Sequence, residues 1–265
     1  MLLDIPTTGF EKELYRHPFW KTLKAPKRVN MFQELRGVEE LYKLWQARKL
    51  LPPLKSDEPE TILVIPGLYC FDFLTFMTRF QLNRAGHSAY GWRMGINWGN
   101  TDKDVPILVE KISGLVEKYG RPVVLLGWSL GGVMAREIAR QYPSLIKMVL
   151  TFGAPIIGGA KYTIVDYWYR LQKIDLDQQE LDLMSQFQVP IQQPIVAYYS
   201  KNDNVVDWRA CIDPYSPHVE HVEVDSTHFG MGFSADIIQH MLAQLQSRAT
   251  KPAAQIVPNY VHSNP

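Results

Sequence analysis

The hydrophobic pattern of the chain changes near Thr61. Before this point an apolar stripe recurs at helical spacing, at Leu35, Val38, Leu41, Leu44 and Trp45. Asn30, followed three residues later by Gln33, reads as a capping box that begins this helix. Pro52 ends it, because proline lacks the amide hydrogen that a helix needs. The pattern therefore predicts a helical N-terminal extension over residues 1–60.

From Thr61 onward the rhythm changes to short strand-like stretches, of which the clearest are the continuous apolar runs at residues 61–65, stopped by Pro66 and Gly67, and at 123–126. Such runs suit strands that are buried on both faces of a parallel sheet. The predicted strands cover residues 61–65, 87–94, 123–126, 147–152, 195–199 and 219–224. Predicted helices lie between or after them, at residues 73–85, 104–119, 133–142 and 234–246. This alternation predicts an α/β fold, with a predominantly parallel sheet and helices on both faces.

One segment, residues 156–194, interrupts the alternation and is longer than an ordinary crossover. We interpret it as a cap insertion, one or two helices over the edge of the sheet. The alternative is a crossover helix with a long loop. The predicted organisation is then a core over residues 61–248 that contains this cap, and an irregular tail over 249–265.

Composition narrows the function classes. A net charge of +1 gives no reason to expect nucleic acid as a partner. The longest apolar runs are too short for a transmembrane helix, and the first residues lack the apolar core of a secretory signal. We therefore expect a cytoplasmic protein. Basic and aromatic residues interleave between positions 10 and 28, which fits either a solvated helix face or peripheral membrane contact.

Three reactive side chains follow three different predicted strands. Ser129 follows the strand at 123–126, Asp203 the strand at 195–199 and His228 the strand at 219–224. In an open α/β sheet, sites form at the carboxyl ends of the strands, so these side chains are expected to meet. Ser129 also stands in Gly-Trp-Ser-Leu-Gly, a nucleophile-elbow motif between a strand and a helix.

These residue types predict nucleophilic catalysis. A serine hydroxyl needs a neighbouring base, and His228 is the best-placed histidine. A carboxylate must orient the imidazole, and we choose Asp203 for this role. Asp207 and Asp213 lie further along the same loop, and Asp225 is the competitor closest in sequence to His228.

Acyl transfer also needs donors for the oxyanion. The amides expected to supply them belong to Leu130, after the nucleophile, and to Leu68, in the loop after the first strand. Trp128, Tyr69 and Trp92 are candidates to line a substrate pocket, although aromatic residues often serve only in packing. Cys70 and Cys211 lack metal-ligand spacing, and their redox state stays open. Hydrolysis by serine, histidine and aspartate implies no metal or organic cofactor.

Several stretches together resemble the α/β-hydrolase superfamily, and within it bacterial lipase- and esterase-like proteins of the triacylglycerol lipase type. They are Ile-Pro-Gly-Leu after the first strand, GWSLGG, FGAPIIGG, YSKNDNVV and STHFGMGF. The resemblance covers residues 61–246. It implies Ser129 as nucleophile, Asp203 as acid, His228 as base and the amides of Leu68 and Leu130 as oxyanion hole. The chain departs from the family pattern at Pro66, where a histidine is usual, and in Gly-Ala-Pro-Ile at residues 153–156.

Together these observations predict a serine hydrolase that cleaves carboxylic esters of small molecules or lipids through an acyl-enzyme. The same triad would also serve a thioesterase or an acyltransferase. A third possibility is a ligand-binding protein that keeps the fold without turnover. The sequence leaves open the acyl chain length, the head group and the oligomeric state.

Overall fold

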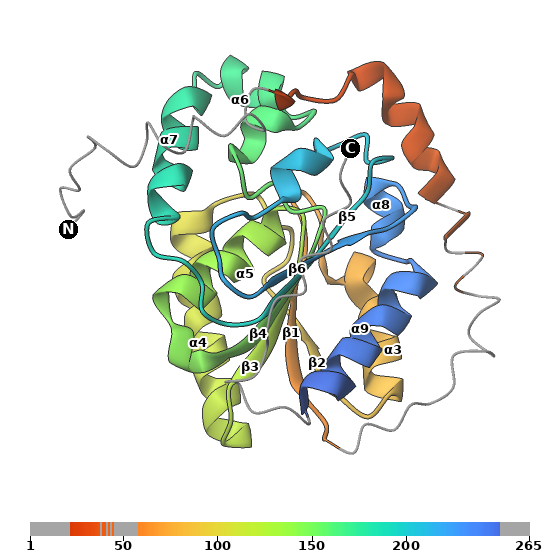
Figure 1. Ribbon diagram of the computed structural model, residues 1–265, viewed down its shortest axis with the longest axis vertical. Helices are drawn as coiled ribbons and strands as arrows, with labels where there is room; N and C mark the ends of the chain where they lie inside the picture. Colours follow the sequence, from red (N-terminus) through yellow and green to blue (C-terminus); the bar gives the residue numbers. More distant parts are fainter. Residues whose placement is uncertain (1–21, 38, 41, 43, 45–57, 250–265) are drawn as a thin grey trace.

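The computed structural model describes residues 22–37, 39, 40, 42, 44 and 58–249. Six strands form one sheet in the order β2-β1-β3-β4-β5-β6, and every neighbouring pair is parallel (Figure 1). The strands are β1 (Thr61–Ile65), β2 (Ser88–Gly91), β3 (Val123–Trp128), β4 (Ile146–Phe152), β5 (Ile195–Tyr199) and β6 (Val219–Glu223). This sheet confirms the predicted fold class.

Helices cover both faces of the sheet (Figure 1). The α-helices are α3 (Phe76–Arg84), α4 (Thr101–Tyr119), α5 (Leu130–Gln141), α6 (Asp166–Leu171), α7 (Leu176–Gln186), α8 (His228–Met231) and α9 (Ala235–Ala249). The 3-10 helices are η2 (Arg28–Arg36), η3 (Asp72–Thr75), η4 (Pro143–Leu145), η5 (Gly159–Tyr162) and η6 (Trp208–Cys211).

The alternation of side chains along each strand divides the core into two layers. In β1, Ile62 and Val64 pack with residues of α3 and α9, whereas Leu63 and Ile65 pack with residues of α4 and α5. All five residues of β1 and all six of β3 are buried. The central strands are therefore apolar without interruption, because both of their faces are covered.

The segment between β4 and β5 holds η5, α6 and α7, which Figure 1 places at the same end of the sheet as α8. A third apolar cluster fastens this segment to the loop after β5, through Ile157, Met184 and Val206 among others. The segment's role as a cap, and the limits of the core and tail, stay predictions.

The N-terminal prediction was wrong in its details. In the described part a 3-10 helix begins at Arg28 with Lys27 at its N-cap position, so Asn30 lies within this helix and not at its N-cap. Leu35, expected in the buried stripe, is 69% exposed. Leu44 is fully buried in the core, while Val38, Leu41 and Trp45 lie outside the described residues. Elsewhere, β2 ends at Gly91, short of the predicted strand end at residue 94.

Candidate active site

The three predicted reactive residues lie at the carboxyl end of the sheet. Ser129 stands between β3 and α5, Asp203 lies in the loop after β5, and His228 is the first residue of α8, after β6. Parallel strands bring these loops to one edge, as expected for a site in an open α/β sheet.

Ser129 has a strained backbone conformation, with φ 53° and ψ −122°. A positive φ is uncommon for a residue with a Cβ and is found mostly where the surroundings enforce it. The surroundings here are glycines: a Cβ at Gly127 would lie 2.4 Å from the Gly131 oxygen, and one at Gly131 would lie 2.3 Å from the Ile65 oxygen. The close approaches that the motif predicted are therefore present, and they hold Ser129 in a sharp turn between strand and helix.

Asp203 and His228 are both buried and hydrogen-bonded. His228 Nδ1 lies 2.7 Å from Asp203 Oδ2. The other carboxylate oxygen, Oδ1, accepts hydrogen bonds from the backbone amides of Val205 and Val206, at 2.8 and 2.7 Å. Because a carboxylate can only accept, Nδ1 of His228 carries the hydrogen and Nε2 is left with its lone pair in the neutral ring.

The electrostatic surroundings favour the protonated form of His228. Burial alone lowers the pKa of this imidazole, but the charge of Asp203, the hydrogen bond to it and the charge of Glu34 outweigh burial and raise the pKa above its usual 6.5. The ring is thus a stronger base than a free histidine.

Ser129 and His228 line the same cavity of about 740 Å³. In the described part of the chain no hydrogen bond joins Ser129 Oγ to the His228 ring, although such contacts are often loose before a substrate binds. The structure therefore joins Asp203 to His228 directly, and places Ser129 on the same wall without a bond to either.

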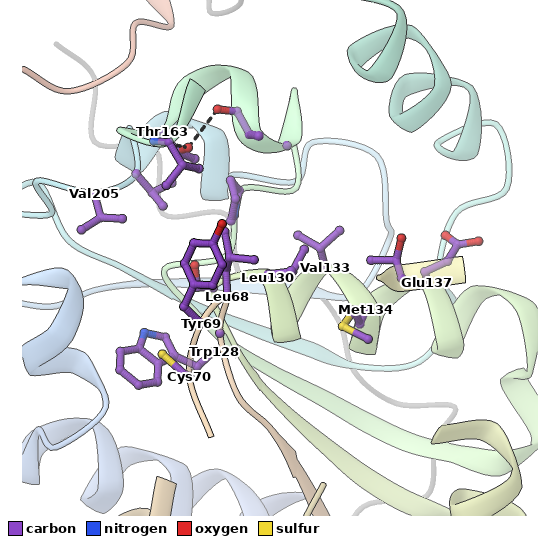
Figure 2. Close-up of a pocket in the computed structure, with 18 of the residues that line it drawn as sticks. Leu68, Tyr69, Cys70, Trp128, Leu130, Val133, Met134, Glu137, Thr163 and Val205 are labelled. Atoms are coloured by element: carbon purple, nitrogen blue, oxygen red, sulfur yellow. Dashed lines mark hydrogen bonds between the residues drawn. The ribbon is translucent and has the colours of Figure 1, made fainter. Parts of the chain in front are cut away.

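The two predicted oxyanion donors also border this cavity. Leu130 opens α5, so its amide has no acceptor within the helix. Leu68 lies in a turn closed by a hydrogen bond from the Cys70 amide to the Gly67 oxygen, at 3.1 Å. Figure 2 shows Leu68 and Leu130 side by side.

A buried asparagine that the sequence reasoning passed over fixes the turn around Leu68. Asn97 has no exposed surface, and its Nδ2 donates to the Pro66 oxygen at 2.8 Å. Its backbone accepts from the Tyr69 amide and donates to the Cys70 oxygen, at 2.7 and 2.9 Å. The Gly-rich loop around Asn97 was its only sequence signal.

The cavity follows one face of α5. Figure 2 shows Leu130, Val133, Met134 and Glu137 in succession along it. The opposite wall comes from η5, α6 and α7. On α5 the lining changes from Leu130, Val133 and Met134 to Glu137 and Gln141 further along the helix. Other polar side chains of the lining come from α7 and α4: Gln179, Gln186, Thr101 and Asp102.

The aromatic pocket residues behave differently from one another. Trp128 and Tyr69 line the cavity. Trp128 is only 1% exposed, and its ring packs against His228 and Phe229 with centroids 6.1 and 6.0 Å apart. The prediction for Trp92 was wrong: this side chain is buried in the core layer beneath α4 and α5, does not line the cavity, and donates from Nε1 to the Gly95 oxygen.

The two cysteines are free and buried, so they form no disulfide. Burial raises the pKa of the Cys70 thiol to about 11, which keeps it protonated although it borders the cavity. Within the described ranges, no three His, Cys, Asp or Glu side chains are grouped to hold a metal ion.

A family model described as Uncharacterised protein family (UPF0227) matches residues 90–245. No curated protein matches the sequence. Among the helices of the described residues, none has the length and apolar character needed to span a membrane.

Solved structures resemble this chain in fold. A structure of LipS and LipT, two metagenome-derived lipolytic enzymes, aligns with TM-score 0.57 and 14% identity over 72% of this chain and 94% of that one. Bacillus licheniformis lipase BlEst2 aligns with TM-score 0.53 and 14% identity, over 72% of this chain and 94% of that one. Paleococcus ferrophilus monoacylglycerol lipase aligns with TM-score 0.52 and 15% identity, over 70% of this chain and 95% of that one. These likenesses confirm the α/β-hydrolase fold.

Proposed function

The chain belongs to the uncharacterised protein family UPF0227, and we propose that it is a serine hydrolase that cleaves carboxylic esters. The observation that carries the proposal is the position of Ser129 and the Asp203-bound His228 on the wall of one largely apolar cavity. The descriptions of the structural neighbours as lipolytic enzymes and lipases agree with it.

In the proposed reaction Ser129 Oγ attacks the ester carbonyl while His228 Nε2 takes its proton. The charge of Asp203 stabilises the imidazolium that forms. The amides of Leu68 and Leu130 bind the oxyanion of the tetrahedral intermediate. His228 then returns the proton to the departing alcohol, and water releases the acyl group from Ser129 by the same route.

The shape of the cavity supports an apolar acyl chain as the bound group. From Ser129 to Gln141, α5 rises by about 18 Å, and the near part of this wall is apolar. Burying a methylene in such a wall stabilises binding by about 0.8 kcal/mol. We therefore propose that medium or long acyl chains lie along α5, with the carbonyl carbon at Ser129.

A panel of chromogenic esters of increasing acyl length tests the proposal, with matching thioesters and with a competing alcohol as acyl acceptor. We expect ester hydrolysis that Ser129→Ala abolishes and that Ser113→Ala leaves intact, since Ser113 is exposed on α4. Preference for thioesters, or transfer to the alcohol in place of hydrolysis, would redirect the proposal to a thioesterase or an acyltransferase. Tight ligand binding with no turnover would contradict it.

A further inference from the structure

Glu34 joins the N-terminal element η2 to the loop that holds Asp203 and to helix α8, which begins with His228. Its Oε1 accepts a hydrogen bond from the Asn204 backbone amide at 2.9 Å, and another from the Asn204 side chain at 3.3 Å. Its Oε2 accepts from the Phe229 amide at 3.0 Å. Asn204 is the residue after Asp203, and Phe229 is the residue after His228.

The contact is buried and closely packed. Glu34 is only 5% exposed, and η2 packs directly on α8. Gly37, just after η2, approaches so closely that a Cβ there would lie 3.0 Å from the Gly230 amide. A buried carboxylate is costly unless its oxygens are hydrogen-bonded, and here each oxygen has at least one backbone donor.

We propose that Glu34 is a positioning residue of the active site, which clamps the Asp203 loop and helix α8 together and stabilises the imidazolium formed during catalysis. This inference rests on the proposed function. It also gives the N-terminal segment a role, because the carboxylate comes from outside the residues matched by the family model.

The charges around His228 are consistent with this role. Asp203 faces it from the loop after β5, and Glu34 from η2; both raise the pKa of the ring. Glu40 lies beside Gly230, two residues after His228 in α8. On the far side of Asp203 the Cys211 thiol stays protonated, because burial and the charges of Asp203 and Asp207 raise its pKa.

The pH dependence of activity distinguishes a purely mechanical role of Glu34 from one in which its charge also acts on His228. If Glu34 only holds the loops, its loss lowers kcat but leaves the acid limb of the pH profile in place. If its charge also acts on His228, its loss lowers the pKa of the ring, and the acid limb moves to lower pH. Ester hydrolysis requires neutral His228, so this limb reports the pKa directly.

The test compares E34Q and E34D with the exposed neighbour variant E39Q as matched control. In E34Q we expect kcat to fall roughly tenfold with KM little changed, and the acid limb of kcat/KM to move down by roughly half a pH unit or more. E34D keeps the charge and should keep the wild-type limb, even where its shorter side chain lowers kcat. E39Q should match the wild type in both.

A titration of the His228 ring by NMR, assigned by comparison with H228Q, gives the same answer without turnover. The ring pKa should lie above 6.5 in the wild type and lower in E34Q. An unmoved acid limb and ring pKa in folded E34Q would overturn the inference while leaving the proposed hydrolase intact. A wild-type ring pKa at or below 6.5 would overturn it even where E34Q does not fold. Absence of turnover in the wild type would instead contradict the proposed function.

Discussion

His228 Nδ1 lies 2.7 Å from Asp203 Oδ2, and both residues are buried, although one begins helix α8 and the other lies in the loop after β5. The hydrogen bond fixes the ring tautomer, so that Nε2 is the atom left to accept a proton. Two backbone amides hold the other oxygen of Asp203. The proposed acid and base are therefore already oriented relative to each other in the absence of substrate.

Removing the charge of Asp203 should impair turnover more than binding. Asp203→Asn presents an amide to Nδ1, which favours the wrong tautomer of His228. We expect kcat to fall by about 10⁴ with KM little changed, as measured by steady-state ester hydrolysis.

Asp225→Asn is the matched control for Asp203→Asn. Asp225 is exposed, and it accepts a hydrogen bond from the Asn202 side chain instead of from His228. A loss of kcat in Asp225→Asn comparable to that in Asp203→Asn would contradict the assignment of Asp203 as the acid.

The sharp turn at Ser129 depends on Gly131. A Cβ at this position would meet the Ile65 and Pro66 oxygens at 2.3 and 2.7 Å. Gly131→Ala should lower the free energy of unfolding by about 1–3 kcal/mol, as measured by urea titration. Gly114, also within a helix, has open space around its Cβ position, and Gly114→Ala should raise stability by about 0.5–1 kcal/mol. Equal effects of the two changes would contradict this interpretation.

The proposed acyl site makes Val133 a determinant of chain length. Val133 lines the cavity on α5, between Leu130 and Glu137. Val133→Phe should fill that space and lower kcat/KM for long-chain esters about tenfold or more. Short-chain esters serve as the internal control and should react at the wild-type rate. A uniform loss across all chain lengths would place the acyl chain elsewhere.

His221 should make stability depend on pH. Burial lowers the pKa of this ring to about 4, with a further lowering by Arg136 and a partial opposing effect of Asp213. Its Nε2 accepts a hydrogen bond from the Asp213 amide, which only the neutral ring can do. Between about pH 4 and 6.5 the unfolded chain binds the proton more readily. The stabilisation is thus complete above pH 6.5 and is lost as pH falls toward 4.

The expected loss over this window is up to about 3 kcal/mol in the free energy of unfolding. His221→Gln keeps an acceptor without a titrating ring, so its stability should fall less steeply with pH. Urea titrations at several pH values measure both slopes. Equal pH dependence of the free energy of unfolding in the wild type and in His221→Gln would rule out His221 as the source of this dependence.

The core of the site could be predicted because its signals are local. The central strands β1, β3 and β5 are short apolar runs; Ser129 directly follows β3, and Asp203 and His228 come four and five residues after the ends of β5 and β6. Once the sheet is parallel, its topology brings these three residues to one edge.

The errors arise where tertiary contacts decide. Glu34 binds backbone amides 170 and 195 positions away, and a backbone amide leaves no trace in the sequence. Trp92 was expected near the site, but β2 ends at Gly91, and the Trp92 side chain packs into the core layer between the sheet and helices α4 and α5. The glycines that flank Trp92 in the sequence do not distinguish a side chain in the cavity lining from one in the core.

The most direct test of the central claim is covalent labelling of the purified protein with a fluorophosphonate, followed by mass spectrometry of its peptides. An activated serine forms a stable adduct, whereas an ordinary hydroxyl does not. We predict one adduct per chain, on Ser129, that is lost in Ser129→Ala and retained in Ser113→Ala. A protein that stays unlabelled, or that carries the adduct on another residue, would contradict the assignment of Ser129 as nucleophile.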